Sequence, residues 1–139
     1  MGAAAWKITA ELVETADLSR IDISSEIADC LGGDLDISHP LAVRSQLSLE
    51  TVIALINWHL PGWAWKIGTC SVSDDAWLCP DYNDPAHRER LIAELGEPVD
   101  NTDWRDAGID IDRRPPGNVE LALLEAFCLA MAYTERAKW

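Results

Sequence analysis

The sequence predicts a single α+β domain over residues 1–139, built as a helix–sheet–helix sandwich with a mostly antiparallel sheet. Three observations lead to this fold class. The chain has 139 residues and is 48 % hydrophobic, which suits one domain that buries a core without metals or disulfides. Strand-like alternation occurs early and in the middle of the chain, with helical segments before and after it. The segment near the C-terminus is apolar enough to form a buried helix.

The N-terminal part predicts an opening strand over residues 6–12, because its apolar and polar side chains alternate one by one. A short helix is expected over 23–31, where apolar side chains recur at four-residue steps and a Gly-Gly pair follows. Residues 32–47 are rich in Gly, Asp, Ser and Pro and predict a connection. We therefore expect residues 48–139 to form the core of the domain, with 1–47 as a candidate N-terminal extension.

Three later segments predict helices. Residues 49–60 repeat apolar side chains every three or four positions, between a capping Ser48 and a Pro-Gly pair. A second helix is expected over 84–96, with an aspartate as its cap and a proline at its first position. The third, over 118–137, is apolar most of the way round. Such a helix is either deeply buried or packed against a second copy, and we expect a homodimer.

A β-hairpin is predicted between the first two of these helices, with strands over 63–72 and 76–79 and a turn at 73–75. In this register Cys70 faces Cys79 across the hairpin. The pair could form a disulfide, but free thiols are the expected state in a reducing compartment. The four cysteines of the chain show neither CxxC spacing nor a paired histidine, so no structural zinc site is predicted.

The charge of the chain limits its partners. It has 24 acidic and 11 basic residues, a net charge of −13, and such a surface repels nucleic acids and anionic lipid. An acidic surface serves either solubility alone or the recognition of a basic protein groove, including one that normally holds nucleic acid. Between Asp74 and Asp112 twelve acids accompany three arginines, and this uneven distribution favours recognition.

The sequence does not predict a membrane protein or an enzyme. No apolar run reaches the roughly 18 residues that cross a bilayer, and the first residues lack the composition of a secretion signal, so we expect an intracellular protein. There is no phosphate-binding loop, nucleophile elbow or zinc-protease motif, and the three histidines have no triad spacing. We therefore expect a binding protein that uses no cofactor.

One acidic group has the residue types of a metal site. Asp81, Asp84 and His87 lie within seven residues and carry side chains that ligate divalent cations. A turn at Asp81 and a helix cap at Asp84 account for the same residues more simply. The structural interpretation is therefore favoured.

A short strand is predicted over residues 108–113, and alternation places Asp110 and Asp112 on the same side of it. Paired carboxylates can perform acid–base chemistry or bind a metal, but no third acid or histidine lies at a suitable spacing. We favour a solvent-exposed face, with Arg113 and Arg114 as candidate partners of the two aspartates.

Seven tryptophans are many for a chain of this length. Most are expected in the core, and one or two could line a pocket for a planar ligand. Alternation places Trp63 and Trp65 on one face of their strand, and the predicted hairpin register places Trp77 on the opposite face of the sheet.

Three motifs and the helix after them resemble a known family. They are PGWAW at 61–65, SDDAWLCPDYNDP at 73–85 and GIDIDRRPPGN at 108–118, followed by a helix rich in Ala and Leu. In these motifs the chain resembles the small phage and prophage proteins of the phage ABA-sandwich domain family, over about two-thirds of its length. The resemblance implies a helix–sheet–helix sandwich and a viral or prophage origin. It implies no particular activity and no catalytic residues.

The charge and the resemblance together favour an inhibitor of a bacterial defence complex, similar to many anti-CRISPR proteins. It would act in the host cytoplasm as a nucleic-acid mimic that docks on a basic groove. Loop carboxylates would form the surface, with one tryptophan as its apolar anchor. The residues expected in this surface are Asp74, Asp75, Asp81, Asp84, Asp103, Asp106, Asp110, Asp112 and Trp104.

Two other functions stay open at this point. A protein that sequesters a nucleotide signal needs a basic group for phosphate and an aromatic group for the base, which Arg113, Arg114 and Trp104 would supply. The net charge of −13 weighs against that hypothesis. An accessory or structural phage protein is the third alternative.

Overall fold

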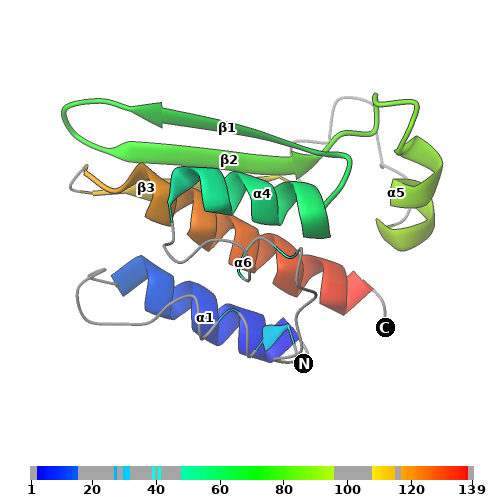
Figure 1. Cartoon of the computed structure of the whole chain (residues 1–139), viewed down its shortest axis with the longest axis horizontal. Coiled ribbons are helices and arrows are strands. Elements are labelled where there is room, and N and C mark those ends of the chain that lie inside the picture. The colour runs from blue at the N-terminus through cyan, green and yellow to red at the C-terminus, as the bar shows by residue number, and fades with distance from the viewer. Residues whose placement is uncertain are drawn as a thin grey trace.

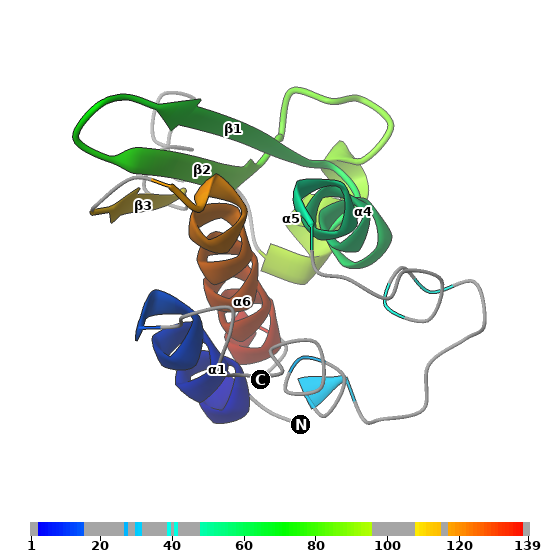
Figure 2. The same cartoon turned by 60° about the vertical axis from the view of Figure 1, so that its left-hand side comes forward.

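The computed structural model describes residues 3–15, 27, 30–31, 39, 41, 48–95, 108–114 and 117–137. In chain order its elements are α1 (Ala3–Thr15), α4 (Leu49–His59), β1 (Trp63–Thr69), β2 (Asp74–Pro80), α5 (Arg88–Leu95), β3 (Ile109–Arg113) and α6 (Val119–Ala137), shown in Figure 1. The described strands form one antiparallel sheet in the order β1-β2-β3. The described helices lie on one side of this sheet (Figures 1 and 2), and the combination of helices with an antiparallel sheet confirms the predicted α+β class.

Helix α6 is the centre of the fold. In Figures 1 and 2 it runs between the sheet and α1, with α4 beside it, and it contacts all of these elements. Every apolar side chain from Leu121 to Cys128 has no exposed surface, as its sequence predicted. Elements of the same chain cover the helix, so its apolar composition is no longer a reason to expect a homodimer.

The predicted N-terminal strand is wrong, because residues 3–15 form helix α1. Over only seven residues, alternating apolar side chains are also compatible with helical spacing. In the structure Trp6, Ala10 and Val13 share the helix face that packs on α6. The Trp6 ring meets the Phe127 ring edge-on at a centroid distance of 5.8 Å. Ile8, an inward residue of the predicted strand, is 60 % exposed.

Part of the first 47 residues therefore belongs to the core. Trp6, Ala10 and Val13 join Ile27 and Cys30 in the same buried cluster as the later elements. Ile27 and Cys30 are in helical conformation, but most of the short helix expected over 23–31 lies outside the described residues.

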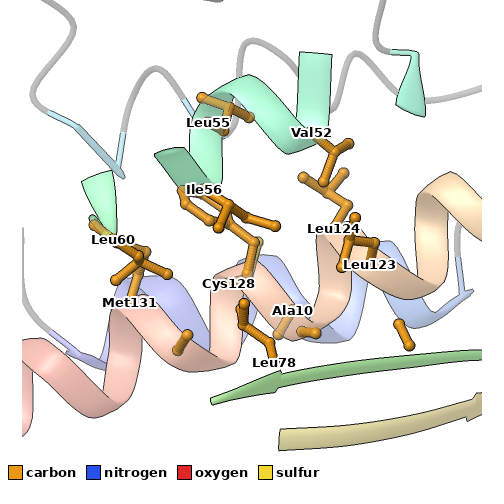
Figure 3. Close-up of a cluster of buried hydrophobic side chains, with 14 of the residues drawn as sticks. Ala10, Val52, Leu55, Ile56, Leu60, Leu78, Leu123, Leu124, Cys128 and Met131 are labelled. Carbon is orange, nitrogen blue, oxygen red and sulfur yellow. The ribbon is translucent and has the colours of Figure 1, made fainter. Parts of the chain in front are cut away.

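Helix α4 begins where its sequence predicted. The Ser48 side chain accepts a hydrogen bond from the Thr51 backbone N–H at 3.3 Å, which caps the first turn. Figure 3 shows its buried side chains against α6, which supplies Leu124, Cys128 and Met131. Gly62 follows the helix with φ of +88°, and a Cβ there would lie 2.6 Å from the Cβ of His87. Glycine therefore allows α4 to turn directly into β1.

The predicted register of the hairpin is wrong. β1 and β2 pair Thr69 with Asp74, so the tip is formed by residues 70–73 and not by 73–75. Asp74 is the physical reason, because its buried carboxylate accepts hydrogen bonds from the Thr69 hydroxyl at 2.7 Å and from the Gly117 and Asn118 backbone N–H groups at 2.7 and 2.9 Å. These bonds hold Asp74 at the start of β2, inside the sheet.

The predicted facing of Cys70 and Cys79 is wrong for the same reason. Cys79 pairs with Ala64, six positions from Cys70 along β1, which is about 20 Å at strand spacing. A disulfide requires Cα atoms within about 7 Å of each other. Cys70 is exposed at the hairpin tip, Cys79 is buried, and both are free thiols.

The helix predicted over residues 84–96 begins later than expected, at Arg88. Asp84 caps a turn first: its side chain accepts a hydrogen bond from the Ala86 backbone N–H at 3.0 Å. Its backbone carbonyl then accepts from the His87 and Arg88 N–H groups, and α5 follows. None of the helices described, including the 19-residue α6, is long and apolar enough to cross a bilayer.

Candidate functional site

The sheet has one face toward the helices and one away from them. Ala76 and Leu78 of β2 point inward and are buried, and Ile109 and Ile111 of β3 pack against the same core. We call the other side the outward face, and no described helix packs on it (Figures 1 and 2). Its charged and aromatic residues are Lys66, Asp75, Trp77, Asp110 and Asp112.

The strand register brings the outward-face aspartates together. Asp75 of β2 lies directly opposite Asp112 of β3, and Trp77 lies opposite Asp110. All three carboxylates are exposed. Two like charges directly opposite on neighbouring strands destabilise a sheet, so the Asp75–Asp112 pair costs the isolated protein some stability.

One cation relieves part of this repulsion. Arg114 reaches one carboxylate oxygen of Asp112 through Nε and Nη2, at 3.3 and 3.2 Å. These hydrogen bonds are the main cause that lowers the pKa of Asp112, with a smaller contribution from Ser73. The side chains are 65 % and 51 % exposed, so water and salt screen the pair and it stays weak.

The aromatic residue of the outward face is half-buried. Trp77 lies opposite Lys66 of β1, whose ammonium is 5.6 Å from the centroid of the indole ring. Pairing with Lys66 places Trp77 on the face opposite to Trp63 and Trp65, as predicted. The outward face therefore combines three carboxylates with apolar aromatic surface.

The predicted partner-binding surface divides into four groups. Asp75, Asp110 and Asp112 lie together on the outward face. The prediction is wrong for Asp74, because this residue is buried and its carboxylate accepts the hydrogen bonds that fix the hairpin. Asp81 and Asp84 follow the far end of β2, away from the Asp75–Asp112 pair. The remaining three, Asp103, Trp104 and Asp106, lie outside the described residues.

Asp81 and Asp84 act as turn caps in the structure. The Asp81 side chain accepts from the Asn83 backbone N–H at 3.0 Å, as Asp84 does from Ala86. Across the described ranges, no three His, Cys, Asp or Glu side chains lie close enough to hold a metal ion. Local backbone hydrogen bonding is thus the role that the geometry supports for these two residues.

Arg113 and Arg114, the two basic residues of the alternative nucleotide site, each have another partner in the structure, and Trp104, its aromatic residue, lies outside the described residues. Arg113 donates hydrogen bonds to the backbone carbonyls of Val13 and Glu14 at 3.1 and 2.9 Å, at the C-terminal end of α1. Arg114 pairs with Asp112. The guanidinium of Arg113 therefore joins β3 to α1, where the helix dipole also favours a cation.

Sequence reasoning missed a pair of histidines. His39 and His59 lie 20 residues apart in the chain, and their Nε2 atoms are 2.7 Å apart in the structure. No periodicity or motif connects the two positions. Only the packing of the chain onto α4 brings the rings together.

The fold and the outward face define a small acidic α+β protein with a cluster of exposed carboxylates on its sheet. No protein family, no curated protein and no solved structure was found to match the chain. The resemblance to phage proteins therefore stays a prediction from the motifs of the sequence.

Proposed function

We propose that this protein acts by binding, and that its outward face docks on a basic protein surface that handles nucleic acid. The observation that carries the proposal is the cluster of Asp75, Asp110 and Asp112, exposed side by side on adjacent strands. A partner that supplies Lys or Arg to this cluster would neutralise the repulsion between Asp75 and Asp112. Binding would thus relieve a cost that the free protein carries.

The composition of the outward face suits a protein interface. Carboxylates give fast association and specificity toward a basic surface, and the net charge of −13 adds long-range attraction. The half-buried ring of Trp77 supplies apolar surface among the carboxylates. Interfaces of this kind commonly place an aromatic side chain at the centre of a polar ring.

The proposed partner is a bacterial defence complex that the protein inhibits as a nucleic-acid mimic in the host cytoplasm. The motif resemblance to phage proteins supports this choice among basic partners. We propose no catalytic role, because the outward-face carboxylates are exposed to water. The alternative function, sequestration of a nucleotide signal, loses support because Arg113 donates its hydrogen bonds to backbone carbonyls of α1. Among the described residues, no specific contact favours the third alternative, an accessory or structural phage protein.

A capture experiment tests the proposed function. Tagged protein is incubated with nuclease-treated bacterial lysate at about 50 mM and about 500 mM salt, which differ several-fold in screening length. We expect a basic, nucleic-acid-handling complex to be retained at low salt and released at high salt. Nucleic acid added back should compete for the same complex. Retention that is equal at both salts, or that added nucleic acid does not change, would contradict docking of this face on a nucleic-acid groove.

A further inference from the structure

Strand β1 lies at one edge of the sheet. The described strands follow the order β1-β2-β3, so β2 pairs with one side of β1 and no described strand lies on its other side (Figures 1 and 2). Two hydrogen bonds show which backbone groups point to which side. The Cys70 N–H donates to the Ser73 carbonyl at 3.0 Å just beyond one end of the β1–β2 ladder, and the Asp81 N–H donates to the Gly62 carbonyl at 2.9 Å just beyond the other end.

These two bonds continue the β1–β2 register without a break. In an antiparallel ladder the residues that turn their N–H and C=O groups toward the neighbouring strand alternate, so the even-numbered residues of β1 bond to β2. The backbone groups of Trp65, Ile67 and Thr69 therefore point away from β2, and we call these three residues the β1 edge. Trp63 points the same way, but its N–H already donates to the Leu60 carbonyl at 3.1 Å.

The β1 edge lacks the features that protect edge strands from pairing. β1 has seven residues, contains no proline, pairs with β2 without a bulge and carries Lys66 as its one charged residue. Trp65 and Ile67 pack against the core but are only partly buried. The other edge strand, β3, is shorter at five residues and carries Asp110 and Asp112, whose charges oppose pairing. Of the two edges, that of β1 is therefore the one on which another strand can add.

A second copy of β1 fits this edge in one register. Two antiparallel β1 strands related by a twofold axis use the whole β1 edge only when Ile67 lies opposite Ile67 of the second copy and Trp65 lies opposite Thr69. This register forms about six backbone hydrogen bonds between the copies. The neighbouring register, centred on Lys66, places two lysines directly opposite each other, which is unfavourable.

The same register brings Lys66 toward Asp75 of the second copy. Lys66 lies opposite Gly68 of the second copy, and Gly68 pairs with Asp75 on the outward face. The Cα atoms of Lys66 and that Asp75 are then two strand spacings apart, about 10 Å. A Cβ at Gly68 would meet nothing within 4 Å, so the lysine stem can cross this position. To do so, the Lys66 ammonium leaves its place 5.6 Å from the Trp77 ring centroid and partly neutralises the Asp75–Asp112 repulsion.

We propose that the protein forms a twofold dimer through the β1 edge, in which the sheets of the two copies join into one continuous antiparallel sheet. The twofold axis is perpendicular to this sheet, so the outward faces of both copies lie on the same side of the dimer. The dimer forms without any basic partner. Self-association and docking on a basic surface are therefore separate properties, and each can fail without the other.

Sedimentation equilibrium of the full chain tests the dimer. We expect the mass to rise from near one chain at about 10 μM to near two chains at about 1 mM, because an interface made by one strand from each copy is small. The mass of a single chain at about 1 mM would overturn the proposal.

Amide hydrogen exchange at the same two concentrations locates the interface. The N–H groups of the β1 edge should exchange at least about fivefold more slowly at the higher concentration, whereas those of Lys66 and Gly68 already bond to β2 and should change little. A dimer that leaves exchange at the β1 edge unchanged would overturn the proposal. Masses above two chains, with new protection at Asp110 and Asp112, would show that β1 pairs with β3 and would overturn the twofold arrangement.

Two variants of equal charge test the register. Gly68→Lys suits the single chain, because the new side chain has open space and faces Asp75 across the hairpin. In the dimer it lies directly opposite Lys66 of the second copy and blocks the path to Asp75, so the dimer dissociation constant should rise about tenfold. Asn83→Lys adds the same charge at an exposed loop position outside β1 and should change that constant by less than about twofold. Circular dichroism confirms that both variants fold. Equal dissociation constants for the two variants would overturn the register.

Discussion

The carboxylate of Asp74 accepts a hydrogen bond from the hydroxyl of Thr69 at 2.7 Å, directly across the hairpin. The same carboxylate accepts from two backbone N–H groups just before α6. One buried side chain therefore fixes the hairpin register and holds the start of the central helix against the sheet.

Asp74→Asn should destabilise the protein by about 1–3 kcal/mol, because an amide cannot satisfy all three donors that the carboxylate accepts. Urea unfolding at pH 7 measures the change. Asp75→Asn is the matched control, since the next side chain is exposed and faces Asp112. This control should be neutral or slightly stabilising, and equal losses in the two variants would show that Asp74 has no special role.

The contribution of Asp74 should depend on pH. Its pKa is lowered from 3.8, first by the hydrogen bond from Thr69 and then by the N–H groups of Gly117 and Asn118. A carboxyl with a lower pKa in the folded state stabilises the protein above its unfolded pKa and loses that contribution as the pH falls through the folded value. The stability difference between the wild type and Asp74→Asn should be full at pH 6–7 and shrink below about pH 4. A difference that stays constant down to pH 3 would contradict this assignment.

Arg113→Ala should destabilise the protein by about 1–3 kcal/mol, because it removes two hydrogen bonds to the carbonyls that end α1. Amide hydrogen exchange should rise most in α1. Arg114→Ala removes the neighbouring, exposed cation and should cost less than about 0.5 kcal/mol. If both variants behaved alike, Arg113 would not hold α1 in place.

Cys70 should be the fast-reacting thiol of the folded protein. It is exposed, and its pKa is lowered, mainly by the Val72 backbone N–H that donates to its sulfur. Burial raises the pKa of Cys79 to about 12 and also raises that of Cys128. Mass spectrometry after brief iodoacetamide treatment at pH 7.5 should find the label on Cys70, and Cys70→Ser should remove it. Rapid labelling of Cys79, or a Cys70–Cys79 disulfide in the folded protein, would contradict the register.

Local signals in the sequence were sufficient for some elements. The cap at Ser48 and apolar side chains at helical spacing predicted α4, the apolar segment over 118–137 predicted α6, and both helices form. The alternation that predicted β3 also placed Asp110 and Asp112 on one exposed face. Each of these predictions depends on neighbours within a few residues.

Other features depend on contacts between distant residues. Residues 6–12 of α1, which were predicted to form a strand, fit both the strand period and the helix period of apolar side chains. Only packing on α6 selects the helix. The hairpin register depends on hydrogen bonds that Gly117 and Asn118, more than 40 residues away, donate to Asp74. The contact between His39 and His59 also requires the tertiary fold, because the two residues lie 20 positions apart in the chain.

The most direct test of the proposed function compares the affinity of the captured complex for two variants by surface plasmon resonance at about 50 mM salt. Asp110→Asn/Asp112→Asn removes two charges from the outward face, and Glu11→Gln/Glu89→Gln removes two from exposed positions on α1 and α5. The change in net charge is identical, so long-range attraction is matched. We expect the first variant to weaken binding by about tenfold or more and the second to change it by less than about twofold. Equal weakening by both variants, or none by the first, would contradict docking through the outward face.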